Sequence, residues 1–198
     1  HLSDRRQRQM CIRDRHSDAG YNNEAQARSR AGGHFYLSRN EDIPPNNGSI
    51  LTIAQIIKAV MSSAAEAELG ALYINAREAV HIRNILTEMG HHQPPTPIQT
   101  DNTTAEGVVN NKIQPKRTKP MDMRFHWLRC RMAQKQFRFH WRPGNTNLGD
   151  YYIKHHPGTH HKNFRREILT PVSKVFKLFK SGESVSLLRG CVEPAGDQ

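Results

Sequence analysis

The stretch SSAAEAEL at residues 62–69 opens the most clearly marked helix of the chain. Ser63 is a typical N-cap residue, Glu66 follows three positions later, and Gly90 provides a C-terminal stop. At about 100° per residue, Glu68 lies roughly 60° from the centre of the helix's apolar stripe. Glu66 is explained by capping, so Glu68 is the carboxylate that this helix presents at the edge of its buried face.

Strand and helix patterns alternate on both sides of this helix. The predicted strands are the segment leading to Asp18 and residues 31–38, 49–60, 96–101 and 136–143. The other predicted helices are residues 102–110, 120–134 and a short one within residues 145–154. Three strands, a helix, a strand, helices, a strand and a helix, in that order, predict a layered α/β domain with a mixed sheet.

Four carboxylates stand at marked positions in this pattern. Asp18 follows the first expected strand, Glu68 opens the long helix, Asp101 ends a strand, and Asp150 follows the last strand. Carboxylates that a fold gathers repel one another and normally need a cation between them. Such clusters serve two-metal phosphodiester chemistry. A lone Asp at a strand end is more often a turn former or helix cap, and Asp101 before Asn102 could be one.

The amino-acid composition limits the classes of function that the chain can have. With 198 residues, of which 36% are hydrophobic, the chain has material for one domain. Its formal charge of +11 favours a polyanionic partner, nucleic acid before membrane. Three widely separated cysteines, Cys11, Cys130 and Cys191, give no disulfide framework or metal motif and favour a reducing compartment. Without a transmembrane-length apolar run or a signal-peptide core, we expect neither a membrane partner nor secretion.

Six short motifs follow one another in a fixed order. They are SDA at 17–19, RSRAGG at 28–33, SSAAEAE at 62–68, TDN at 100–102, RTK at 117–119 with MDMR at 121–124, and LGD at 148–150. Each motif is weak by itself, but their order over about 150 residues is a specific signal. The pattern resembles the ribonuclease H domain of copia-type LTR retrotransposon Pol polyproteins.

This resemblance implies a ribonuclease H-like three-layer α/β fold, with a five-stranded mixed sheet flanked by helices. It also implies that Asp18, Glu68, Asp101 and Asp150 are both catalytic residues and ligands of two Mg²⁺ ions, for which Mn²⁺ can substitute. Asp18 is expected to bridge both ions, with Glu68 and Asp101 on one and Asp150 on the other. One ion would lower the pKa of the attacking water, and the other would stabilise the leaving 3′ oxygen.

The implied substrate is the RNA strand of an RNA–DNA hybrid, cut endonucleolytically during reverse transcription. The implied protein partner is the reverse transcriptase domain of the same polyprotein, in a cytoplasmic virus-like particle or in the nucleus. Selection of RNA would depend on contacts to the 2′-hydroxyl. Basic residues expected to bind the hybrid's backbone are Lys112, Lys116, Arg117, Lys119 and Arg124. The basic connector at 112–119 could instead be a solvated loop.

The expected domain spans residues 16–171. The segment before Asp18 should be an apolar strand, yet residues 5–15 read RRQRQMCIRDR. We therefore interpret residues 1–15 as a disordered or non-native segment outside the family. Residues 172–198 match nothing in the family and are expected to form a disordered basic tail.

Two further groups of side chains have a chemical and a structural interpretation. Histidines near the end of the domain suggest zinc, but without a Cys-x-x-Cys partner or regular spacing they are better explained as solvated loop residues. They are His155, His156, His160 and His161. Four aromatic residues could stack on bases, although their spacing favours core packing for most of them. They are Trp127, Phe137, Phe139 and Trp141.

Two function classes therefore remain open. One is a metal-dependent endonuclease that degrades RNA in RNA–DNA hybrids. The other is a catalytically inactive relic that binds nucleic acid through its charge and keeps the fold without ordered metals. The integrity of the strand that carries Asp18 separates the two.

Overall fold

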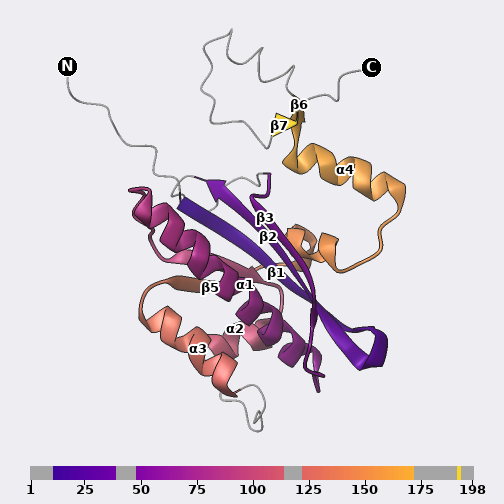
Figure 1. The fold of residues 1–198 in the computed structure, drawn as a ribbon. Coiled ribbons are helices and arrows are strands. Elements are labelled where there is room, and N and C mark those ends of the chain that lie inside the picture. The colour runs from indigo at the N-terminus through magenta and orange to yellow at the C-terminus, as the bar shows by residue number, and fades with distance from the viewer. Residues whose placement is uncertain (1–10, 39–47, 114–121, 172–190, 193–198) are drawn as a thin grey trace, which may run out of the picture.

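A mixed sheet of five strands forms the centre of the computed structural model, which describes residues 11–38, 48–113, 122–171 and 191–192 (Figure 1). The strands are β1 (Cys11–Glu24), β2 (Arg28–Ser38), β3 (Leu51–Ile57), β4 (Thr96–Thr100) and β5 (Phe137–Trp141). Their spatial order is β3-β2-β1-β4-β5. β2 pairs antiparallel with β1 and β3, whereas β4 pairs parallel with β1 and β5, so the predicted mixed sheet is confirmed.

Helices and short 3-10 turns connect the strands. The α-helices are α1 (Ala64–Glu88), α2 (Thr103–Val109), α3 (Asp122–Ala133) and α4 (Gly158–Ile168). The 3-10 helices are η1 (Ala25–Ala27), η2 (Gly144–Thr146) and η3 (Leu148–Tyr152). The sequence pattern does not predict α4, because its large apolar side chains are only Phe164 and Ile168. Of the helices in the described part of the chain, none is long and apolar enough to cross a membrane.

Both ends of α1 carry the expected local signals. The Ser63 hydroxyl accepts a hydrogen bond from the Glu66 amide at 3.2 Å, as an N-cap does. The Glu66 carboxylate is also used in capping, but it accepts from the amide of Ser62 at 2.6 Å. At the other end Gly90 has a φ of 86°, a left-handed conformation that ends the helix. Local chemistry therefore fixes the start of α1, and with it the position of Glu68.

Two neighbouring glycines of β2 define the layers. A Cβ added at Gly33 would collide with the side chain of Asn75 on α1. A Cβ added at Gly32 would lie 2.5 Å from the carbonyl oxygen of Gly149 on η3. Successive residues of a strand point to opposite faces of its sheet. α1 and η3 therefore cover opposite faces, which gives the three layers that were predicted.

The two faces of the sheet are buried in different ways. On the α1 side, the strands pack against the helices through a cluster of large apolar side chains. Its most buried large members are Phe35, Ile57, Leu72, Ile98, Leu128 and Phe137. On the η3 side, the buried residues include His16, His34 and Tyr36, whose rings lie within 6.2 Å of one another. Apolar burial holds one face, and a polar aromatic cluster fills part of the other.

The first strand begins earlier than the expected domain boundary at residue 16. β1 starts at Cys11, which pairs with Ser38 of β2, and residues 11–15 are therefore part of the sheet. Ladder hydrogen bonds are made by the backbone and do not require apolar side chains, which explains a strand in so polar a segment. Residues 1–10 lie outside the described residues. Within the expected tail, β7 (Cys191–Val192) pairs with β6 (Thr170–Pro171), and the rest of residues 172–198 lies outside them too.

The buried amide of Asn75 generates a prediction about stability. It donates to the Ser17 hydroxyl at 2.8 Å and to the Gly32 carbonyl at 2.9 Å, and so joins α1 to β1 and β2. Asn75→Ala removes both of these buried hydrogen bonds, which costs about 1–3 kcal/mol. We expect the Tm in thermal unfolding to fall by about 2–4 °C for each kcal/mol.

The matched control is Asn84→Ala, the same change at an exposed position of the same helix. Exposed substitutions of this kind usually stay within about 0.5 kcal/mol. Equal Tm values for the two variants would contradict the role assigned to Asn75.

Candidate metal centre

The site lies where β1 and β4 separate. Their last pair in parallel register is His16 with Gln99, after which β4 ends at Thr100 while β1 continues beside β2. Asp18 and Asp101 each stand two residues beyond that pair, so the register brings Asp18, in the middle of β1, level with Asp101, just past the carboxyl end of β4. In open α/β sheets this is where ligands bind.

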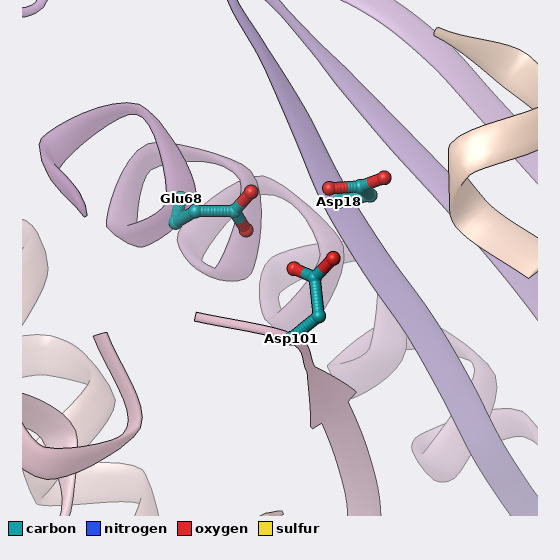
Figure 2. A group of neighbouring side chains, drawn as sticks. All are labelled: Asp18, Glu68 and Asp101. Atoms are coloured by element: carbon teal, nitrogen blue, oxygen red, sulfur yellow. The ribbon is translucent and has the colours of Figure 1, made fainter. Parts of the chain in front are cut away.

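Glu68 reaches the same place from the second turn of α1, as Figure 2 shows. One carboxylate oxygen from each of Asp18, Glu68 and Asp101 lies within 4.8 Å of the other two. Asp18 is 5% exposed and Glu68 is 6% exposed, whereas Asp101 is only half-buried. The structure therefore brings together three of the four predicted ligands, and Asp101 is the one most open to solvent.

Backbone groups orient these carboxylates. The amide of Ala19 donates to Asp18 Oδ1 at 2.9 Å and to Glu68 Oε1 at 3.0 Å, which holds the two groups side by side. The indole N–H of Trp141 donates to the carbonyl oxygen of Asp101 at 2.8 Å. Glu68 Oε2 is buried with no hydrogen-bond partner among the described residues. A buried carboxylate oxygen without a donor is well suited to binding a cation.

Asp150, the fourth predicted ligand, lies beside the group of three. It comes from η3, on the other face of the sheet, and its side chain is close enough to Asp18 to contribute to the raised pKa of that carboxyl. Its negative charge also acts on Asp101. Lys154, one turn further along the chain, forms an ion pair with Asp150. Asp18 is therefore in contact with Glu68 on one side and with Asp150 on the other.

Burial and the short distances between the carboxylates raise the affinity of these groups for protons. Burial, together with the hydrogen bond to Asp150, raises the pKa of Asp18 to about 7 from an ordinary value of 3.8. Burial and the charge of Asp18 raise the pKa of Glu68 well above its ordinary value. Burial raises the pKa of Asp101, and the charge of Asp150 adds to that rise. Without a cation, the cluster therefore retains protons that a divalent ion would displace.

The donor set indicates which kind of ion fits. The three side chains offer carboxylate oxygens alone, with no sulfur or imidazole ligand in the group. Hard divalent cations such as Mg²⁺, Mn²⁺ and Ca²⁺ prefer oxygen ligands, whereas zinc prefers sites with nitrogen or sulfur. The unpartnered Glu68 Oε2 and the raised pKa values both fit a site that is completed by such a cation.

The residues expected to bind nucleic acid are described only in part. Lys112 is exposed and forms an ion pair with Glu106 at 2.8 Å. Arg124 is half-buried, and its guanidinium lies 5.7 Å from the centre of the Tyr73 ring. The remaining three, Lys116, Arg117 and Lys119, lie outside the described residues.

The histidine group near the C-terminal side of the domain packs around an aromatic ring. Tyr151 stacks on His156, with ring centres 5.3 Å apart, and its hydroxyl is 2.5 Å from His161 Nδ1. His160 stacks on His156 at 4.2 Å. In the part of the chain that the structure describes, these histidines belong to no group of three that could hold a metal. His160 and His161 belong to α4 and are therefore not the loop residues that were expected.

The four aromatic side chains have mostly the packing role that their spacing favours. Phe137 and Phe139 are buried in the core, and Trp127 packs against it. Trp141 differs, because it is 46% exposed and hydrogen-bonds to the backbone of Asp101. Residues that sequence reasoning did not assign to the site are Trp141, Lys154, His16 and Asn147. Only Lys154 had a local signal, since a lysine four positions after an aspartate is a typical ion-pair spacing.

Comparisons with solved structures agree with the fold. LC11-RNase H1, solved in complex with an RNA/DNA hybrid, superposes with a TM-score of 0.50 at 11% identity, covering 73% of this chain and 93% of that one. The N-terminal RNase H domain of rv2228c from Mycobacterium tuberculosis gives 0.48 at 15% identity, covering 73% and 91%. The superposition on LC11-RNase H1 agrees with a ribonuclease H-like fold.

A sequence comparison adds a curated relative. The chain is 28% identical over 109 residues to the retrovirus-related Pol polyprotein from transposon TNT 1-94 of Nicotiana tabacum. The match covers 55% of this chain and 8% of the polyprotein, so the chain corresponds to a small part of it. No protein-family model matches. The resemblance to a retrotransposon Pol polyprotein, first drawn from six motifs, is confirmed.

The raised pKa of Asp18 predicts how stability depends on pH. The folded value of about 7 exceeds the ordinary 3.8, so between these pH values the folded state binds more protons than the unfolded state. Stability from this group therefore falls as pH rises through that window in metal-free protein. Asp18→Asn removes the cost of ionisation and should raise the Tm at pH 7.5 by several degrees, since 1 kcal/mol is about 2–4 °C.

At pH 4 we expect the difference between Asp18→Asn and the wild type to become small. Glu88→Gln, at an exposed position near the end of α1, serves as the control for removing one negative charge. A Tm difference that is the same at pH 4 and at pH 7.5 would rule out the pKa assigned to Asp18. Scanning calorimetry in the presence of a chelator makes the measurement.

Proposed function

We propose that this chain is the ribonuclease H domain of a copia-type LTR retrotransposon Pol polyprotein, and that it cuts RNA in RNA–DNA hybrids. The observation that carries the proposal is the convergence of Asp18, Glu68 and Asp101, with Asp150 beside them, where β4 ends next to β1. LC11-RNase H1, which has the same fold, was solved with an RNA/DNA hybrid. The tobacco relative is a Pol polyprotein.

In this proposal the cofactors are two Mg²⁺ ions, for which Mn²⁺ can substitute. Asp18, Glu68 and Asp101 would hold one ion, and Asp18 with Asp150 would hold the other; the proximity of Asp18 to both Glu68 and Asp150 supports this assignment. The chemistry that such ions supply is a lower pKa of the attacking water and neutralisation of the charge on the leaving 3′ oxygen.

The protein's own groups prepare the site for that chemistry. The Ala19 amide keeps Asp18 and Glu68 in a fixed relative orientation. Their burial excludes water from the inner side of the site, while the half-buried Asp101 lies on the side open to substrate. Because the pKa of Asp18 is about 7, binding of a cation releases protons, and affinity for the ion rises with pH through neutrality.

The condition of β1 favours an enzyme over an inactive relic. The strand runs from Cys11 to Glu24, with β2 on one side and β4 on the other, and its two register irregularities lie on either side of the stretch from Arg15 to Gly20 that carries Asp18. A damaged strand would have displaced Asp18, which is instead buried beside Glu68 and Asp101. The close approach of Asp18, Glu68 and Asp101 supports the proposed ligands of one ion.

The basic charge of the chain supports a nucleic-acid substrate. The formal charge is +11, and the proposed contacts to the hybrid's backbone are Lys112, Lys116, Arg117, Lys119 and Arg124. The reverse transcriptase domain of the same polyprotein is the proposed partner. The proposed compartment is a cytoplasmic virus-like particle or the nucleus, where hybrids form during reverse transcription.

Cleavage of a labelled RNA–DNA hybrid tests the proposal. We expect the RNA strand to be cut in Mg²⁺ or Mn²⁺, with the DNA strand and a DNA duplex left intact. Asp101→Asn should lower the rate by at least about 100-fold, because it replaces a ligand oxygen by an amide at nearly equal volume; that factor corresponds to about 2.7 kcal/mol in the barrier. Glu88→Gln, an exposed control, should cut at the wild-type rate.

Cutting that needs no divalent cation, or that survives Asp101→Asn, would contradict the assignment of the site. Salt-sensitive binding of the hybrid without any cleavage would favour the inactive relic. Neither binding nor cleavage by a folded sample would reject both.

The ion pair between Lys112 and Glu106 allows a test of the proposed binding surface. Lys112→Ala should reduce the slope of log K against log salt by about 1, as expected for one lost phosphate contact. Glu106→Gln frees the lysine and should strengthen binding at low salt. Lys58→Ala, at an exposed position outside the proposed surface, is the control. Equal slopes for Lys112→Ala and Lys58→Ala, measured by fluorescence anisotropy, would remove Lys112 from the interface.

A further inference from the structure

Of the four carboxylates, Asp150 is the one whose position is least clearly fixed by a long helix or a strand of the sheet. Asp18 belongs to β1, Asp101 follows β4, and Glu68 is on α1, all anchored by the apolar core. Asp150 instead lies on η3, a five-residue 3-10 helix. Such a short helix has little internal stability, so contacts with the sheet must set the position of this residue.

η3 rests directly on the backbone of the sheet. A Cβ at Gly32 would lie 2.5 Å from the carbonyl oxygen of Gly149, and a Cβ at Gly149 would lie 2.8 Å from the carbonyl oxygen of His16. No side chain therefore separates η3 from β2 or β1 at this point. At that spacing, short side chains can form hydrogen bonds with the backbone. Such bonds can fix the position of η3 relative to β1 and β2.

Asn147 supplies two of those hydrogen bonds. It is 5% exposed, its Oδ1 accepts from the Gly149 amide at 3.0 Å, and its Nδ2 donates to the Ser17 carbonyl at 2.9 Å. One side chain therefore caps the start of η3 and ties that start to β1. The point of attachment is the residue immediately before Asp18.

His16 supplies a third hydrogen bond from the opposite direction. Its ring is 2% exposed, and Nδ1 accepts from the Leu148 amide at 2.9 Å. The amide is the only donor of that bond, so Nδ1 carries no proton. His16, Ser17 and Asp18 are consecutive in β1, and the first two of them hold η3.

A second contact supports the far end of η3. His34 Nδ1 lies 2.9 Å from the hydroxyl of Tyr152, and the two rings stack with centres 6.0 Å apart. β1 therefore holds the beginning of η3 and β2 holds its end, with Asp150 between the two.

We propose that His16 and Asn147 are positioning residues, and that together they form a buried clasp that sets the distance between Asp150 and Asp18. The clasp consists of the His16–Leu148, Asn147–Gly149 and Asn147–Ser17 hydrogen bonds. This inference rests on the proposed function, because it assigns to the clasp the placement of the ligand of the second metal ion.

Amide hydrogen exchange and Mn²⁺ binding test the clasp without relying on catalysis. We expect His16→Leu and Asn147→Ala to increase the exchange rates of the Leu148 and Gly149 amides at least tenfold, with no change in α1. Titration with Mn²⁺, followed by electron paramagnetic resonance, should show the weaker of two sites lost and the stronger one retained. His16→Asn, whose Oδ1 can accept in place of Nδ1, should restore slow exchange and the second site.

The matched control is Asn110→Ala. Asn110 also joins a helix end to a strand, since its Nδ2 donates to the Phe139 carbonyl at 3.2 Å, but it acts at α2 and β5. We expect this variant to keep both Mn²⁺ sites and slow exchange in η3. If His16→Leu does not fold, Asn147→Ala and His16→Asn still decide the outcome.

Unchanged exchange in η3 of the Asn147→Ala protein would overturn the clasp. Faster exchange with two intact Mn²⁺ sites would also overturn it, because η3 would then be anchored without positioning a ligand. A wild-type protein that binds no Mn²⁺ would instead reject the proposed function, and the positioning of a metal ligand with it, whatever the exchange rates are.

Discussion

Repulsion among buried carboxylates is the constraint on which the rest of this structure depends. Asp18, Glu68 and Asp101 offer oxygens within 4.8 Å of one another, and two of the three are almost fully buried. Such a group opposes folding unless protons or a cation neutralise it. The apolar cluster between the sheet and α1–α3 supplies the stability that offsets this repulsion. Burial is the largest cause of the raised pKa values of these three carboxylates, and the charges of neighbouring carboxylates add to it.

The two faces of the sheet hold the parts of the site by different kinds of contact. On the α1 face, apolar packing and the amide of Asn75 hold α1 against β1 and β2, and so fix Glu68 relative to Asp18. On the other face, His16 and Asn147 hold η3 through polar contacts. One site is thus assembled from a part stabilised by burial of apolar surface and a part stabilised by directional hydrogen bonds.

Features that local chemistry specifies could be predicted from the sequence. Ser63 and Gly90 mark the ends of α1 because capping acts within one turn, and the succession of strands and helices along the chain follows from their patterns. The register of β1 with β4 and the contacts of Asn147 with Ser17 could not be predicted, since they join residues far apart in the chain with no periodic signal. The start of β1 at Cys11 was hidden by polar side chains, whereas the backbone alone forms the ladder.

The Ala19 amide has a consequence for what substitution experiments can detect. It donates to both Asp18 and Glu68, yet it belongs to a residue whose side chain carries no functional group. Exchanging that side chain for another leaves the N–H in place. Substitutions at position 19 therefore test only whether a side chain of another size fits there. Proline is the one standard residue that removes the donor. Part of this site is therefore formed by the main chain, and neither the identity of the residue nor an alanine scan reveals that part.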